Sequence, residues 1–146
     1  MGFFHRIKAF WAARGANSAA PPPASRKARG DAAEAAAIAW LQQKGLTLLE
    51  RNYHTPGRGG GEIDAIMRAA DGTLVFVEVR LRASSDQGGA AASVGSTKQR
   101  RIIRAARHYL QRMQAPPPCR FDVMACDNAA PPWQWNWLVA AFDAHE

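Results

Sequence analysis

Two apolar segments joined by a short turn most constrain the fold of this chain. The segments EIDAIMRA and TLVFVEVRL, at residues 62–69 and 73–81, are separated only by Ala70-Asp71-Gly72. Their β-branched and aromatic content and the glycine between them predict two antiparallel strands of one hairpin. On the second strand, the face that begins with Leu74 and Phe76 ends in charged residues, as expected for a buried strand whose end opens into a site.

The loop length of this hairpin decides whether two of its acids meet. A two-residue turn would direct Glu78 to the face opposite Asp64, because side chains alternate along a strand. A three-residue loop pairs Ala69 with Thr73 and places Asp64 opposite Glu78. Such a loop favours a left-handed glycine at its end, which Gly72 supplies. We therefore expect the three-residue loop and two acids on one face.

Two carboxylates opposed in this way repel each other, and a divalent cation between them would remove the repulsion. Oxygen ligands suit Mg²⁺ or Mn²⁺. The pattern thus predicts a metal site that contains Asp64 and Glu78. The alternative is a simple ion pair of Glu78 with Arg80 at the strand end, with Asp64 as a solvated edge residue.

The remaining periodic segments predict two helices and three more strands. Helices are expected over residues 31–44, ended by Gly45, and over 96–114, and strands over 46–53, 119–126 and 133–142. The second helix has an apolar stripe that contains Ile102, Ala106, Tyr109 and Met113. The order α-β-β-β-α-β-β favours an α/β fold in which helices pack on a mixed sheet.

The basic charge of the chain is concentrated at its N-terminus. The net charge is +7, and residues 1–30 hold six of the Lys and Arg residues and no acid. Residues 3–14 have helical apolar spacing and could contact a partner or a membrane surface; a frayed extension and a transit peptide are alternatives. We expect residues 1–29 to be this basic extension followed by a Pro/Ala-rich linker, and one domain over 30–146.

Cys119 and Cys126 fit neither a disulfide framework nor a zinc site. No apolar run approaches the ~20 residues that span a bilayer. The cysteine usage favours a protein of the reducing cytoplasm.

Six segments together resemble one family. They are GDAAEAAAIAWLQQKG, LLERNYH, GGEIDAIMR, LVFVEVRLR, KQRRIIRAARHYL and CRFDVMA, in this order within residues 30–143, and they resemble the YraN-like bacterial family. That family looks like a branch of the PD-(D/E)xK nuclease-like superfamily, near archaeal Holliday-junction resolvases. The resemblance implies a three-layer α/β/α restriction-endonuclease-like fold with a central mixed sheet. It also implies a hydrolase: a metal-dependent endonuclease on structured or branched DNA, acting in DNA repair or recombination, with a homodimer as the related assembly.

The resemblance implies catalytic roles for Glu34, Asp64, Glu78 and Arg80, with Mg²⁺ or Mn²⁺ on Asp64 and Glu78. Arg80 stands where the superfamily has lysine, and a guanidinium does not give up its proton to act as a base. It can still stabilise negative charge; otherwise the chain is a catalytically impaired nucleic-acid-binding or accessory module on the same fold. Glu34 has its own alternative as part of a capping box with Asp31 as N-cap.

Polar residues near these acids are expected to support the site. Glu62 shares the face of Asp64, and Gln99 opens the second helix beside Lys98, which could reach the acids in place of the missing lysine. The outer face of that helix is expected to bind nucleic acid through Lys98, Arg100, Arg104 and Arg107. A solvated helix face is the alternative.

Two further patterns are interpreted as structural. Trp133, Trp135 and Trp137 alternate and would lie on one side of the last strand, where core packing is favoured over stacking on bases. Arg120 and Asp122 are expected to form a structural ion pair.

Overall fold

The computed structural model describes residues 25–81, 94–128 and 130–144. The helix considered for residues 3–14 and most of the expected linker lie outside this part of the chain. The elements are α2 (Arg26–Gln43), β1 (Thr47–His54), β2 (Glu62–Arg68), β3 (Leu74–Leu81), α3 (Ser96–Leu110), β4 (Cys119–Cys126) and β5 (Asn136–Phe142). Their order is the predicted one.

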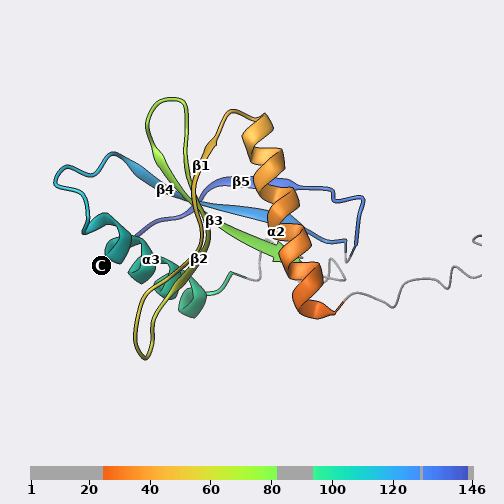
Figure 1. Ribbon diagram of the computed structural model, residues 1–146, viewed down its shortest axis with the longest axis horizontal. Helices are drawn as coiled ribbons and strands as arrows, with labels where there is room; N and C mark the ends of the chain where they lie inside the picture. The colour runs from red at the N-terminus through yellow and green to blue at the C-terminus, as the bar shows by residue number, and fades with distance from the viewer. Residues whose placement is uncertain (1–24, 82–93, 129, 145–146) are drawn as a thin grey trace, which may run out of the picture.

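The five strands form one mixed sheet in the order β1-β2-β3-β4-β5. The β3–β4 pair is parallel and the other pairs are antiparallel. Helices α2 and α3 cover opposite faces of this sheet, which confirms the three-layer α/β/α architecture (Figure 1). Strand β3 contributes to both sides of the core, since Val75 and Val77 pack on the α2 side and Phe76 on the α3 side.

The β2–β3 hairpin has the expected register. The N–H of Ala69 donates to the carbonyl of Thr73 over 2.9 Å, and Gly72 takes a left-handed φ of 91°. The ladder then runs from Arg68 opposite Leu74 to Ala65 opposite Val77. The three-residue loop is therefore confirmed.

Helix α2 begins at Arg26, five residues before the predicted start, so the linker is shorter than expected. Its N-cap is Ser25, whose hydroxyl oxygen accepts from the N–H of Ala28 at 3.1 Å. The predicted capping box with Asp31 as N-cap is therefore wrong, because Asp31 lies inside the helix and pairs with Lys27 at 3.0 Å. A serine followed by good helix formers explains the earlier start.

The C-terminal ends of the two helices differ in how well the sequence predicted them. Gly45 ends α2 with a φ of 99°, and the Leu46 N–H donates to the Leu41 carbonyl at 3.1 Å, so the expected glycine stop is confirmed. Helix α3 ends at Leu110 instead of residue 114. The proline at position 116 follows soon after and disfavours helical backbone before it.

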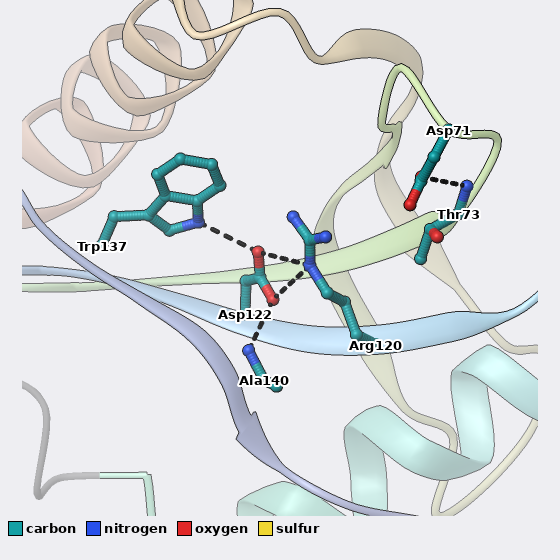
Figure 2. Close-up of polar contacts among 6 residues, drawn as sticks. All are labelled: Asp71, Thr73, Arg120, Asp122, Trp137 and Ala140. Carbon is teal, nitrogen blue, oxygen red and sulfur yellow. Dashed lines mark hydrogen bonds and ion pairs between the residues drawn. The ribbon is translucent and has the colours of Figure 1, made fainter.

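The Arg120–Asp122 ion pair is confirmed and forms the centre of a buried polar cluster (Figure 2). Asp122 is 0% exposed. Its carboxylate accepts from Arg120 Nε at 3.1 Å, from Trp137 Nε1 at 2.9 Å and from the N–H of Ala140 at 3.0 Å. Ala140 has a φ of 51°, next to an irregularity in the β4–β5 pairing that the carboxylate fills.

The tryptophans pack against the protein, although not all from a strand. Strand β5 begins at Asn136, so the expectation that Trp133 and Trp135 alternate along it is wrong. Those two rings stack on each other with centroids 5.9 Å apart. Trp137 meets the edge of Trp40 from α2, also at 5.9 Å, and packs on the core. Neither helix, α2 or α3, is long and apolar enough to cross a membrane.

Candidate functional site

Asp64 and Glu78 lie where strands β2 and β3 separate. Their ladder ends at Ala65 and Val77, one pair before the two acids. Beyond that point a side-chain hydrogen bond replaces the backbone ladder, because Oδ2 of Asp64 accepts from the N–H of Val79 at 2.8 Å. Asp64 is 8% exposed and Glu78 is 3% exposed. Asp64 is therefore not the solvated edge residue of the alternative interpretation.

The two oxygens of Glu78 have different environments. Oε1 lies 3.5 Å from Lys98 Nζ and 3.7 Å from Arg80 Nη1. Oε2 is buried and has no hydrogen-bond partner within the described segments. Burial, then the charge of Asp64 and a side-chain hydrogen bond with it, raise the pKa of Glu78 to about 8 against the opposing effect of Lys98 and Arg80. One carboxylate oxygen of Glu78 thus lies beside two cations, whereas no hydrogen-bond donor of the described residues reaches the other.

Glu34 joins the same cluster from α2. It is half-buried, and burial, then the charge of Asp64 and a side-chain hydrogen bond with it, raise the pKa of Glu34 to about 7. Asp64 interacts with both glutamates, so acids from one helix and two strands converge on one place. The register of the hairpin predicted the meeting of Asp64 and Glu78, and the family resemblance implied that Glu34 joins them, although the helix start was predicted differently.

The donor set fits a hard divalent cation that is only partly held by protein. In the described segments, no group of three or more His, Cys, Asp or Glu side chains is arranged to hold a metal ion. Asp64 and Glu78 offer neighbouring carboxylate oxygens, and no donor within the described segments reaches Oε2 of Glu78. Mg²⁺ commonly takes one or two carboxylates and completes its shell with water and phosphate. The residues present therefore fit Mg²⁺ or Mn²⁺ with part of its shell supplied by water or phosphate. They do not fit a metal ion whose ligands all come from the protein.

The other predicted site residues are placed less uniformly. Lys98 reaches Glu78 from the first turn of α3, as considered for a lysine that replaces the one missing at position 80. Glu62 is half-buried at the start of β2, opposite His54. The Gln99 amide donates to the carbonyl of Val94 at 3.0 Å. This bond ties Gln99 to the segment before α3 and not to the acid cluster.

The cationic face of α3 has the predicted exposure. Arg100, Arg104 and Arg107 are exposed, whereas Ile102 and Ala106 are buried in the core. Arg104 is held in place, because its Nη1 donates to the carbonyl of Gly59 at 2.9 Å. The helix face is thus joined to the loop between β1 and β2.

Sequence reasoning missed two residues beside Arg104. Arg58 from the β1–β2 loop and His108 from α3 line a pocket together with it. The sequence offers one signal, the four-residue spacing of Arg104 and His108, which places both on one helix face. That the loop lies against this face could not be read from the spacing.

Comparison with known proteins identifies the family of the chain. Residues 33–126 match the family described as "Uncharacterised protein family UPF0102". A UPF0102 protein of Albidiferax ferrireducens is 64% identical over 118 residues, which cover 81% of this chain and 89% of the relative. One of Polaromonas naphthalenivorans is 57% identical over 135 residues, covering 89% and 88%, and one of Paracidovorax citrulli is 60% identical over 131 residues, covering 87% and 94%. The chain therefore belongs to the UPF0102 family, which is the YraN-like nuclease-like family that its motifs resemble.

Proposed function

We propose that this protein hydrolyses phosphodiester bonds in DNA with the help of Mg²⁺ or Mn²⁺ held by Asp64 and Glu78. One observation carries the proposal: two buried carboxylates from neighbouring strands converge, and Oε2 of Glu78 has no partner within the described segments. A purely structural acid pair would be expected to satisfy both oxygens.

The electrostatics of the cluster favour cation binding. Burial and then the charge of Asp64 penalise the ionised form of Glu78 and raise its pKa to about 8, so Glu78 keeps its proton at neutral pH. A divalent cation removes the penalty by taking the place of that proton. Glu34 is a third acid beside Asp64, so once all three acids are ionised their charge exceeds that of Lys98 and Arg80.

The residues around the acids have separable roles in such a reaction. The cation, when bound, would polarise the phosphate and activate water. Lys98 and Arg80 lie beside Glu78 and are partly exposed, so they can contact a phosphate that approaches the acids. Arg80 suits a two-point clamp on phosphate oxygens but not proton transfer. Glu34, with a pKa of about 7, is suited to accept a proton near neutral pH.

The finer features of the proposal rest on the resemblance to resolvase-like nucleases. They are a structured or branched DNA substrate, a role in repair or recombination, a homodimer and a cytoplasmic location. A homodimer would suit a branched substrate, because two copies would present two equivalent sites to its arms.

A cleavage assay tests the proposal. Purified protein is incubated with Mg²⁺ or Mn²⁺ and a panel of junction, flap, single-stranded and duplex DNA, with matched RNA. We expect cleavage of a branched DNA, a loss of about 100-fold or more in Asp64→Asn, and an increase in Arg80→Lys. Arg68→Lys, an exposed residue at the other end of β2, is the matched control. Absence of cleavage by both wild type and Arg80→Lys on every substrate would rule out the enzyme.

A second candidate is a nucleic-acid-binding accessory module that has lost catalysis. The 3.7 Å contact between Arg80 and Glu78 favours it, because a guanidinium there can neutralise the acid permanently. Calorimetry with Mn²⁺ separates the two candidates. The nuclease requires binding that Asp64→Asn abolishes, whereas the accessory module predicts no Mn²⁺ binding by either protein.

A further inference from the structure

A polar pocket lies between the β1–β2 loop and the outer face of α3, on a part of the helix away from the acid cluster. It has a volume of about 260 Å³ and is lined by Thr55, Pro56, Arg58, Gly60, Arg104, His108 and Gln111. None of these lining residues is acidic, and three carry or can carry positive charge. The pocket is therefore chemically suited to an anion.

The pocket is built from a fixed loop and a fixed helix. Gly61 is buried, and a Cβ at this position would lie 1.9 Å from the carbonyl oxygen of Arg101, so the loop backbone contacts α3 directly. The loop closes on itself through Thr55, whose N–H donates to the Gly61 carbonyl at 3.0 Å. Arg104 spans both elements through its bond to Gly59. Figure 1 shows this hairpin end (yellow) beside α3 (teal).

The cationic side chains of the pocket are partly oriented in advance. Nδ1 of His108 is hydrogen-bonded to the hydroxyl of Tyr53, so Nε2 is the ring nitrogen left to contact a ligand. Tyr53 itself is buried, which fixes the position of the imidazole. Arg104 uses Nη1 for Gly59, and its other guanidinium N–H groups remain available for a second acceptor. Donors held in this way lose less entropy when they bind an anion.

We propose that this pocket binds a backbone phosphate of a polynucleotide strand, with Arg58, Arg104 and His108 as its ligands. A polynucleotide is favoured over a small anion because the same helix face continues the positive charge beyond the pocket. Arg100 and Arg107 are exposed on α3, which has no acid. A single phosphate would use one end of this surface, whereas a strand would use all of it.

Helix α3 contributes residues to both the pocket and the acid cluster, at different positions along its axis. Lys98, which contacts Glu78, precedes Arg104 by six residues and His108 by ten, so the two places are about 9–15 Å apart along the helix. This separation corresponds to roughly three to four base-pair rises of 3.4 Å. The inference extends the proposed function by assigning a surface that holds the strand on one side of the cleavage point, but it concerns binding alone.

Binding is tested by fluorescence anisotropy with labelled single-stranded and duplex DNA, over a series of salt concentrations in EDTA. Arg58→Gln, Arg104→Gln and His108→Gln are compared with Arg68→Gln, which makes the same charge change about 20 Å away at the other end of β2. We expect each arginine variant to weaken binding about fivefold at 0.1 M salt. The slope of log K against log salt should fall by about 0.7–0.9 for each phosphate that the variant no longer neutralises. Arg68→Gln should change neither quantity.

Three results would overturn the pocket. One is that Arg58→Gln and Arg104→Gln bind with the affinity and salt slope of Arg68→Gln. Another is that the wild type binds no polynucleotide. The third is that inorganic phosphate at millimolar concentration displaces the DNA completely, which would indicate a small-anion site. Arg58 lies on an exposed loop, so its variant keeps the test valid if Arg104→Gln disturbs folding. Because EDTA removes the metal, weaker binding by these variants stands whether or not the protein cleaves DNA.

Discussion

Two buried carboxylates in neighbouring strands of this sheet are treated in opposite ways. Asp122 in β4 accepts from a guanidinium, an indole and a backbone N–H, so both of its oxygens have donors (Figure 2). Glu78 in β3 is as deeply buried, but Oε2 has no partner in the described segments and an acid is its neighbour. The first arrangement stabilises the ionised acid in the fold, whereas the second leaves an ionised Glu78 with a penalty that a proton removes and that the proposed cation would also remove.

The comparison separates a structural acid from a candidate functional acid without reference to relatives. Both acids lie beside an arginine two residues away in sequence, Arg120 and Arg80. The difference lies in the donors from other elements, since β5 supplies two donors to Asp122. Glu78 instead receives a lysine and repulsion from Asp64. Unsatisfied burial of this kind commonly marks sites of chemistry.

The largest expected effect comes from Asp122→Ala. Removal of the carboxylate leaves Arg120 and two further donors without their acceptor, so the free energy of unfolding should fall by about 3–5 kcal/mol. Urea unfolding followed by circular dichroism measures it. Removal of the charge at the other centre by Glu78→Gln should leave stability at pH 8 unchanged or higher. Equal losses in both variants would show that the two acids do not differ in kind.

The next effect is a dependence on pH. The folded pKa of Glu78 is raised to about 8 from 4.5, so the folded chain binds more protons than the unfolded chain between these values. The stabilisation from this proton is fully present below pH 4.5 and is lost as pH rises through 8, on the order of 2–4 kcal/mol. Thermal unfolding of wild type at pH 5 to 9 should show the fall, and Glu78→Gln should show a smaller one. A wild-type stability that rises with pH in this range would contradict the repulsion described for the cluster.

A divalent cation should reverse that loss. Mn²⁺ at about 100 times its dissociation constant should add about 2.7 kcal/mol of stability at pH 8 and less at pH 5, where protons compete for the same oxygens. The shift in Tm can be measured by calorimetry, with Asp64→Asn as the control that should not respond. We expect no contribution of Asp122 to the Mn²⁺-induced shift in Tm. Asp122→Asn should therefore respond to Mn²⁺ as wild type does, provided that it folds.

The smallest effect is expected for Trp137→Phe. The substitution keeps an aromatic ring beside Trp40 but removes the indole donor to Asp122, for an expected loss of about 1 kcal/mol. Urea unfolding with Trp133→Phe as control measures it. A loss no larger than that of the control would mean that the indole hydrogen bond contributes little to the satisfaction of Asp122.

Much of the fold and part of the site could be predicted from the sequence because short-range rules govern them. Loop length and Gly72 fixed the register of the β2–β3 hairpin, and with it the meeting of Asp64 and Glu78. The same rules failed for Asp31, because the composition of residues 15–29 suggested a linker while Ser25 began a helix inside it.

The features that could not be predicted depend on how elements pack. Whether Lys98 reaches Glu78 is decided by where α3 crosses the sheet, which helical periodicity does not specify. The pocket with Arg58 and His108 requires the β1–β2 loop to lie on α3, a contact between segments about 45 residues apart in the chain. No local pattern encodes such contacts.

The absence of a side chain at Gly61 has a mechanical consequence. Not even a methyl group fits between this backbone and the backbone of Arg101. The β1–β2 hairpin therefore cannot slide along the helix without losing this close backbone contact. Strand β2 begins at the next residue, and Asp64 follows Gly61 by only three residues. A displacement of α3 would therefore also displace the start of β2, and with it Asp64.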